Sequence, residues 1–518
     1  MAMVYPTQRN FDAWTALGNK GWTHTEMAPY YKKFHTFSPG SQKTNDLLAL
    51  DSYFKPENQG QEGPISATFP DAYGPFNEAW VRAFDSVGFR DSSDPILGKK
   101  LGSFTPPNTI DPKDNTRSYS ASAYYTKEIE RRSNLDLLTE IYVSKILSEG
   151  TDGSVTAKGV QVADRNGTTH DIYGDTVILA AGALQSPQVL ENSGIGAKAI
   201  LERHGIEPVI DNPGVGENLQ DHCFTTVSFE VADGQISGDV VRDPTIVAAL
   251  LKQYQETRSG PLSGVPLSLA YAPPVDIDGR MDRESVAALV KAHLDQDDGT
   301  VDPGRKAQYA QLRSMILDPT ESTCFYGLMP SQMHVRPEGK TSMGQAYSQQ
   351  LPQNFITIMV GLNHPLSHGN VHIGSRDPRS PPRIDPAYLS HPMDVEVLAR
   401  GTQFIEKLVQ QPAMQELLKP ESRIPPHATD LTDLAQTKQI MRDRLWTTYH
   451  SSCTCAMMPR ELGGVVNDRL VVHGTKNIRV IDASVLPMIV LGNIQSTVYA
   501  VAERASDLIK EDWATGSA

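Results

Sequence analysis

Two polar residues near the carboxyl end of the chain could carry out acid–base chemistry together. His450 lies in the segment 446–457, and Asn493 lies in a turn after Gly492. A neutral imidazole can accept a proton near pH 7, and a carboxamide can hold a substrate oxygen. A structural interpretation is also open for each, because a lone histidine can be a satisfied structural residue and asparagine tolerates left-handed turns. Residue type and spacing alone do not decide between the two.

The elements that must position these residues can be predicted from hydrophobic patterning. The amphipathic segment 430–445 predicts a helix that leads to His450, and a closing helix follows Asn493. The apolar run 175–183 predicts a buried parallel strand that delivers a glycine to a helix capped by Ser186. A small antiparallel sheet is predicted from four alternating runs: 135–139, 141–147, 159–164 and 170–173.

Composition limits the class of protein. At 518 residues the chain is long enough for two intertwined domains and a buried cavity, and its net charge of -14 argues against a nucleic-acid partner. No apolar run approaches the roughly 18 residues of a membrane span, and residues 1–10 lack the apolar core of a signal peptide, so we expect a cytoplasmic protein without a membrane partner. The four cysteines are too sparse for a disulfide framework, and Cys453 and Cys455 match no usual zinc spacing. Buried free thiols and no metal site are expected.

A series of motifs runs along the chain in a fixed order. They are 181–187 with 193–196, Asn212 to His222, Pro365-Leu366-Ser367 with Gly369, Asp385-Pro386 with Tyr388, 450–457, 479–484 and Gly492-Asn493. In this order they resemble the motifs of the glucose-methanol-choline (GMC) flavoprotein oxidoreductases. The likeness is collinear from Asp12-Ala13-Trp14 to the final helix. One departure is Cys453, because family members usually carry a glycine there.

The resemblance implies a mixed fold, α/β plus α+β. Residues 1–220 would form the discontinuous first part of a doubly wound FAD-binding domain, and 446–518 would return to it with the catalytic pair. Residues 221–373 would form a substrate domain on an antiparallel sheet, with the helical segment 374–445 packed across it. In the family, a strand and a Gly-x-Gly-x-x-Gly turn precede the region of Trp14, and this sequence begins after them. The doubly wound sheet is therefore expected to be incomplete, with an exposed strand edge and exposed apolar surface.

The resemblance also implies how the polar pair would act. His450 would be the catalytic base that takes the hydroxyl proton of a small-molecule alcohol. Asn493 would occupy the second active-site position, which is His or Asn among members, and would hold the substrate oxygen.

The cofactor implied by the resemblance is FAD. Asp482 and Ala483 would lie by its ribityl and pyrophosphate groups, and Asn493 with Ile494 would add further contacts. Val143 would contact the adenine moiety through backbone atoms.

The predicted function is therefore oxidation of a CH–OH group by a FAD-dependent oxidoreductase, with hydride transfer to flavin and His450 as base. Two alternatives stay open because the nucleotide-binding turn is not part of the sequence. The first is a flavin-free enzyme that uses His450 for acid–base chemistry as an isomerase, dehydratase, cyclase or lyase. The second is an inactive binding protein.

Overall fold

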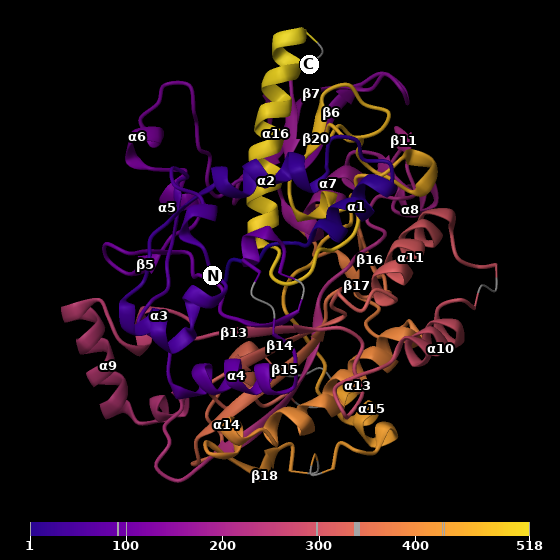
Figure 1. Cartoon of the computed structure of the whole chain (residues 1–518). Coiled ribbons are helices and arrows are strands. Elements are labelled where there is room, and N and C mark those ends of the chain that lie inside the picture. The colour runs from indigo at the N-terminus through magenta and orange to yellow at the C-terminus, as the bar shows by residue number, and fades with distance from the viewer. Residues whose placement is uncertain are drawn as a thin grey trace.

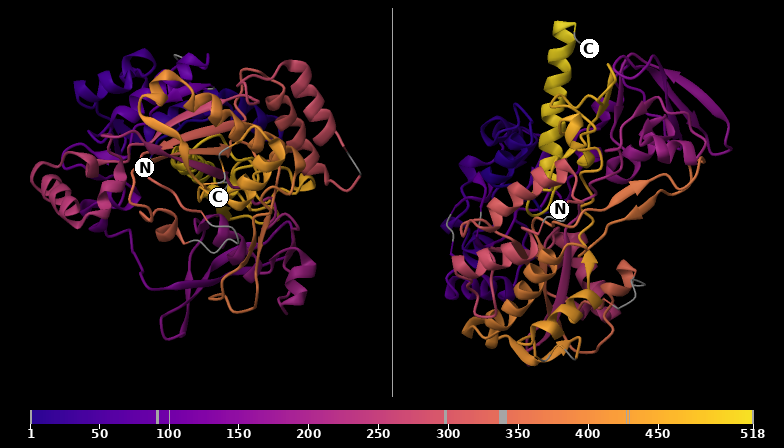
Figure 2. Two further views of the ribbon diagram at one scale, coloured as in Figure 1. Left: turned by 90° about the horizontal axis from the view of Figure 1, so that it is seen from below. Right: turned by 90° about the vertical axis from the view of Figure 1, so that its right-hand side faces the viewer.

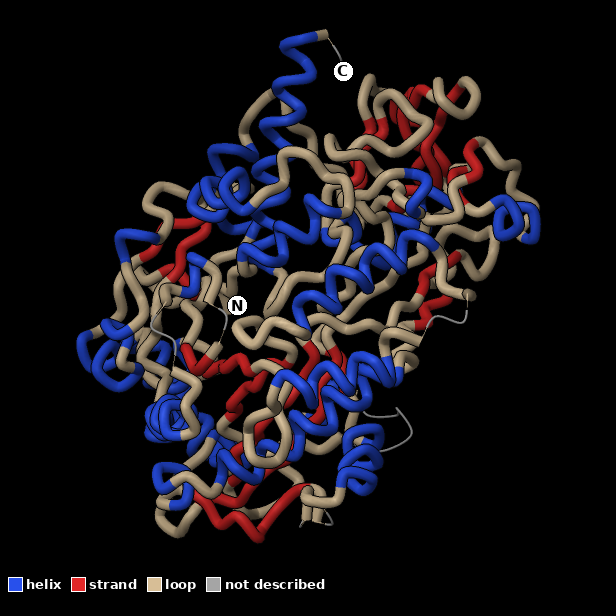
Figure 3. The backbone as a smooth tube through the Cα atoms, turned by 45° about the vertical axis from the view of Figure 1, so that its right-hand side comes forward, coloured by secondary structure: helices blue, strands red, loops and turns tan. Residues whose placement is uncertain are grey.

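The chain folds around a large antiparallel sheet at one end and a smaller parallel pair at the other (Figure 1). The computed structural model describes residues 2–90, 93–99, 101–296, 299–335, 342–426, 428 and 430–516. Drawn by secondary structure, the strands gather in these separate regions with helices between and around them (Figure 3). The combination of an antiparallel sheet with a short parallel sheet confirms the predicted mixed fold class.

The antiparallel sheet has seven strands within the described residues. Six follow one path, in the order β18 (Leu418–Ile424), β12 (Cys223–Val231), β15 (Phe355–Leu362), β14 (Cys324–Met329), β13 (Ser268–Ala272) and β3 (Gly102–Phe104). The seventh, β19 (Trp446–Thr447), pairs with the start of β12. Every residue of β15 is buried, which is typical of a strand covered on both faces.

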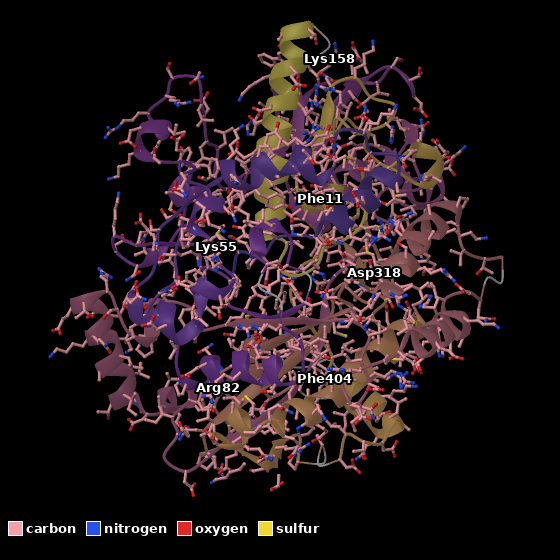
Figure 4. The ribbon with its side chains drawn as sticks, viewed as in Figure 1. Phe11, Lys55, Arg82, Lys158, Asp318 and Phe404 are labelled. Carbon is pink, nitrogen blue, oxygen red and sulfur yellow. The ribbon has the colours of Figure 1, made fainter. Side chains whose placement is uncertain are left out.

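Helices cover one face of this sheet, with Phe404 at their centre. Phe404 belongs to α13 (Pro392–Val409), and Figure 4 labels it in the lower half of the molecule. Its ring centroid lies 5.6 Å from that of Tyr326 and 6.3 Å from that of Phe84 on α4 (Pro75–Ser86). Edge-to-face contacts of this kind fix the helices on the sheet. α10 (Arg283–His293) and α15 (Leu434–Asp443) pack against α13 beside this cluster.

The opposite end holds the parallel pair β9 (Val177–Leu179) and β20 (Ile478–Val480). α7 (Gly182–Asn192) follows β9, and α16 (Gln495–Thr515) is the last helix. A three-stranded antiparallel sheet of β6 (Tyr142–Glu149), β7 (Thr156–Ala163) and β8 (Thr169–Tyr173) lies at this same end, beside α16 (Figure 2). This small sheet confirms the strands predicted after residue 140.

The parallel pair has the open edge that the sequence predicted. Within the described residues, β20 is the one strand partner of β9. Ile178 on β9 is 47% exposed, and Trp513 on α16 is 66% exposed. Two large apolar side chains at this end of the molecule are therefore exposed to solvent.

The first helices tie the start of the chain to its end. α1 (Gln8–Ala16) places Trp14, whose Nε1 donates to the Met488 carbonyl at 3.1 Å. α2 (His24–Lys33) lies against α16, and Tyr31 Oη donates to Thr497 Oγ1 at 2.9 Å. Phe11, labelled in the upper half of Figure 4, packs its ring edge against Trp14 with centroids 5.3 Å apart. This packing holds the start of α16 in place.

Two predicted boundaries are wrong. Residues 135–139 form no strand, and Leu137 and Leu138 are about three-fifths exposed, at 60% and 62%. α7 begins at Gly182, not at Pro187 after a Ser186 cap, because the Asp482 carboxylate accepts the Gly182 amide and caps the helix from a distant segment. Local sequence could not reveal a cap that comes from 300 residues away.

The remaining elements are short or peripheral. The helices are α3 (Gln42–Leu48), α5 (Ser120–Ala123), α6 (Lys127–Glu130), α8 (Lys198–Arg203), α9 (Pro244–Thr257), α11 (Pro303–Ile316), α12 (Met343–Ala346) and α14 (Pro412–Gln415). The strands are β1 (His35–Phe37), β2 (Ile65–Ala67), β4 (Ile110–Asp111), β5 (Thr116–Arg117), β10 (Ile195–Gly196), β11 (Ile210–Asp211), β16 (Asn370–His372) and β17 (Arg383–Asp385). Among the described residues, no helix combines the length and apolarity that crossing a membrane requires. All four cysteines are free and buried, as predicted.

The proposed division into domains stays a prediction. The edge strand β3 and the helix α4 come from the segment assigned to the first domain, yet they pack with the antiparallel sheet. The segment 374–445 contains the helices α13, α14 and α15 and also the edge strand β18.

Candidate active site

His450 is held beside the start of the central strand β12. β19 pairs with this strand, and Thr447 lies opposite Cys223. The His450 amide donates to Asp221 Oδ1 at 2.8 Å, and the Thr448 amide donates to the His222 carbonyl at 3.0 Å. Hydrogen bonds from these two backbone amides therefore fix His450 next to Asp221 and His222, which are 229 and 228 positions away in the sequence.

Asp221 is the anchor of this arrangement. Besides the His450 amide, its carboxylate accepts hydrogen bonds from the hydroxyls of Tyr388 and Thr447. Burial raises the pKa of Asp221, although all of these donors oppose the rise. A carboxylate with several donors holds the loop before His450 in one conformation.

Asn493 reaches the site from the turn that precedes α16. Gly492 has a φ of 68°, and a Cβ there would lie 2.3 Å from Tyr271 Oη and 2.5 Å from Val4 Cγ1. Glycine is required because it alone fits both the left-handed conformation and the close approach. Ser496 Oγ donates to the Val4 carbonyl at 2.7 Å and fixes the first turn of the helix.

The two predicted residues meet directly. The Asn493 amide nitrogen lies 3.1 Å from His450 Nε2, and both side chains are partly buried. Burial lowers the pKa of His450 well below its usual 6.5, and the neighbouring His222 lowers it further. The imidazole is therefore neutral at pH 7, which is the state that a general base requires.

Asp482 and Ala483 lie at the carboxyl end of β20. The Asp482 carboxylate accepts from the Gly182 amide at 2.9 Å, from the Ser186 hydroxyl at 2.5 Å and from the Ser484 amide at 2.8 Å. It is therefore engaged within the protein, whereas Ala483 is partly exposed. The Ala483 carbonyl accepts the Cys453 amide at 3.1 Å, which links this turn to the loop of His450.

The other two predicted cofactor residues lie in different settings. Ile494 follows Asn493, is 8% exposed and occupies the N-cap position of α16. Val143 lies on β6, opposite Val162, in the three-stranded sheet and not on the strands that carry the other residues. The structure thus joins five of the six predicted residues through the loop of His450, the turn at 482–483 and the turn at 493–494, and Val143 stands apart.

The start of α16 is a place where a negatively charged group could bind. Its N-cap residue offers no side-chain acceptor, so the first amides of the helix are not capped by Ile494. The aligned peptide dipoles favour negative charge at this end. A reduced flavin ring is negatively charged, and the residues present here fit such a group.

Sequence reasoning missed His222, which contacts His450 directly, and Asn363, which contacts His222. His222 Nδ1 lies 2.9 Å from His450 Nδ1, and His222 Nε2 lies 2.9 Å from the Asn363 carbonyl oxygen. His222 ends the motif from Asn212, so its position was noted but its role was not. No local pattern could pair it with a residue so distant in the chain.

Comparison with known proteins gives a consistent result. Family models described as GMC oxidoreductase match residues 1–224 and 365–502. The chain is similar to dehydrogenase mpl7 of Monascus purpureus, with 34% identity over all of this chain and 82% of that protein. It is also similar to the GMC oxidoreductase family protein Mala s 12 of Malassezia sympodialis, with 31% identity over 98% of this chain and 77% of the relative.

Solved structures agree with the sequence matches. A FAD-dependent oxidoreductase from Chaetomium thermophilum superposes with a TM-score of 0.85 at 28% identity, over 99% of this chain and 84% of that one. A formate oxidase superposes with a TM-score of 0.79 at 26% identity, over 99% of this chain and 82% of its own. The architecture is therefore shared over nearly the whole chain.

Proposed function

Because the chain belongs to the GMC oxidoreductase family, we propose that it oxidises the CH–OH group of a small organic alcohol with FAD as cofactor and His450 as base. The chain is an enzyme of the oxidoreductase class. The observation that carries the finer proposal is the contact between His450 Nε2 and the Asn493 amide. It supports a site in which one group accepts a proton and the other donates a hydrogen bond.

Each residue of the pair has one task in this proposal. The alcohol hydroxyl donates to His450 Nε2 and accepts from the Asn493 amide, so it takes a place between the two groups. As the alcohol carbon loses hydride, the hydroxyl proton passes to His450 Nε2 and leaves a carbonyl oxygen and an imidazolium ring. The Asn493 amide holds that oxygen throughout.

FAD, when bound, supplies the acceptor for the hydride. Ala483, Asn493 and Ile494 would hold the flavin end of the cofactor, and Asp482 would brace them through its bonds to α7. Val143 would hold the adenine end. The start of α16, whose N-cap residue supplies no side-chain cap, would favour negative charge on the bound ring.

A visible absorption spectrum of the purified full-length protein tests the proposal first. We expect flavin absorption bands, and we expect anaerobic addition of a small aliphatic or aryl alcohol to bleach them. The His450→Gln variant should keep the bands and bleach about 10²–10⁴-fold more slowly, since that is the usual contribution of a general base.

Other outcomes would contradict it in distinct ways. If the protein were well folded but colourless, the proposed oxidoreductase mechanism would be wrong for this chain. If that colourless protein converted a substrate and His450→Ala abolished the conversion, the flavin-free acid–base alternative would replace it. If neither His450→Ala nor Asn493→Ala changed how the protein acts on any substrate tested, the alternative of an inactive binding protein would be favoured.

A further inference from the structure

His222 is completely buried and directly precedes β12. Its Nε2 lies 2.9 Å from the carbonyl oxygen of Asn363, the residue that follows β15. A carbonyl oxygen can only accept a hydrogen bond, so the hydrogen must be on Nε2 of His222. In a neutral ring, the other nitrogen, Nδ1, then carries a lone pair.

That lone pair faces the proposed base. His222 Nδ1 and His450 Nδ1 are 2.9 Å apart, and the two rings are nearly perpendicular at 85°. Two nitrogens at this distance share one hydrogen. Because His222 already carries its hydrogen on Nε2, the shared hydrogen belongs to His450 Nδ1. Burial agrees with neutral rings, since it lowers the pKa of His222 to about 4.

The other ring nitrogen of His450, Nε2, gives a second test of this assignment. With hydrogen on Nδ1, Nε2 of His450 must carry a lone pair and must face a donor. The group 3.1 Å away is the amide nitrogen of Asn493, which donates. The three hydrogen bonds then run in one direction: Asn493 donates to His450, His450 donates to His222, and His222 donates to the Asn363 carbonyl. The opposite direction is impossible, because a carbonyl oxygen has no hydrogen to donate.

We infer that His222 is a positioning residue that keeps the hydrogen of His450 on Nδ1 and so leaves Nε2 as the nitrogen that accepts the substrate proton. The functional part of this inference rests on the proposed role of His450 as base. When His450 takes up a proton at Nε2, the ring becomes an imidazolium whose Nδ1–H already has an acceptor. A carboxylate in the same place would raise the basicity of His450, whereas a neutral imidazole orients the ring without adding charge.

Two substitutions of His222 test the roles of its two ring nitrogens separately. In His222→Asn, the amide lies near the former Nδ1 and can still accept from His450. In His222→Gln, the longer amide reaches the former Nε2, donates to the Asn363 carbonyl and leaves His450 Nδ1 without its acceptor. The Gln variant preserves the bond that stabilises the buried carbonyl, so it serves as the folded test and the Asn variant as its matched control.

The test is the tautomer of His450 in full-length protein labelled with ¹⁵N in its histidine rings. Two-bond ¹H–¹⁵N spectra distinguish a nitrogen that carries hydrogen from one that does not, and His450→Gln identifies the His450 signals among the 14 histidines. We expect hydrogen on Nδ1 in the wild type and in His222→Asn. In His222→Gln we expect a larger share of the tautomer with hydrogen on Nε2, because only Asn493 then still favours hydrogen on Nδ1. Hydrogen on Nε2 in the wild type, or an unchanged tautomer in His222→Gln, would overturn the inference.

Kinetics supply a second readout. His222→Gln should lower kcat for alcohol oxidation by about 10–100-fold with KM nearly unchanged, and His222→Asn should restore most of the loss. Equal kcat values in wild type and His222→Gln would contradict a positioning role. A wild type that oxidises no alcohol would end the proposed function, while the tautomer spectra would still decide the arrangement of the two rings.

Discussion

The Asn493 amide nitrogen lies 3.1 Å from His450 Nε2, so the free protein already keeps a hydrogen-bond donor on the nitrogen that we propose as the base. The contact joins two turns that are 43 residues apart, one at the edge of the antiparallel sheet and one at the start of α16. A substrate hydroxyl that enters between the two groups can donate to one and accept from the other. Changes to either partner should therefore alter the proton transfer and not only the binding of substrate.

Asn493→Asp should weaken the base by stabilising its protonated form. A carboxylate beside His450 favours the imidazolium and raises the pKa of the ring. At pH 7, kcat/KM should fall by about tenfold or more, and the acidic limb of the pH profile should move to higher pH. Asn493→Ala is the control, because it removes the donor without adding charge and should leave the limb in place. Coincident limbs in the two variants would contradict this electrostatic interpretation.

The wild-type pH profile should show an unusually acidic limb. A general base acts only when it is unprotonated, so activity is lost as pH falls through its pKa. Burial holds the pKa of His450 well below 6.5, and the facing His222 acts in the same direction. We therefore expect kcat/KM to stay constant from about pH 8 down to below about pH 6.5. Measurement across this range checks the prediction, and a limb at or above pH 7 would contradict it.

The sequence predicted the polar pair but not the groups that orient it. His450 and Asn493 could be assigned because each stands in a motif that resembles one family. His222 contacts His450 from the start of β12, and Asn363 contacts His222 from the end of β15, so both contacts depend on how those strands pair. Pairing between distant strands is a tertiary property, so local motifs do not contain it.

The starts of α2 and α7 also show that local sequence reveals only those helix caps that lie nearby in the chain. α2 begins with a capping box of Thr23 and Glu26, two residues within the local sequence. The start of α7 was placed five residues late, because its cap is the Asp482 carboxylate, which follows the other strand of the parallel pair.

Gly492→Ala should destabilise the protein more than Gly182→Ala. Both glycines have positive φ, 68° and 81° respectively, so both variants carry backbone strain. A Cβ at Gly492 would meet Tyr271 and Val4 at 2.3 and 2.5 Å, whereas a Cβ at Gly182 meets nothing within 4 Å. We expect a loss of about 2–5 kcal/mol at Gly492 and about 1–2 kcal/mol at Gly182. Urea unfolding of both variants gives the comparison, and equal losses would show that close packing at Gly492 contributes nothing.

His372 should make the stability of the fold decrease at alkaline pH. Its Nδ1 lies 2.7 Å from the fully buried Glu191 and its Nε2 lies 3.1 Å from Glu217. Burial alone would lower its pKa, but the two carboxylates outweigh burial and raise it to about 9. Because this value exceeds that of the unfolded chain, the stabilisation is complete below about pH 6.5 and is lost as pH rises through about 9. The Tm should fall more steeply between pH 7 and pH 10 in the wild type than in His372→Gln.

His473→Gln is the control, since that ring contacts the Met458 carbonyl at 2.9 Å, and it should keep the wild-type slope. Identical slopes in wild type and His372→Gln would show that this ion pair does not govern the alkaline loss.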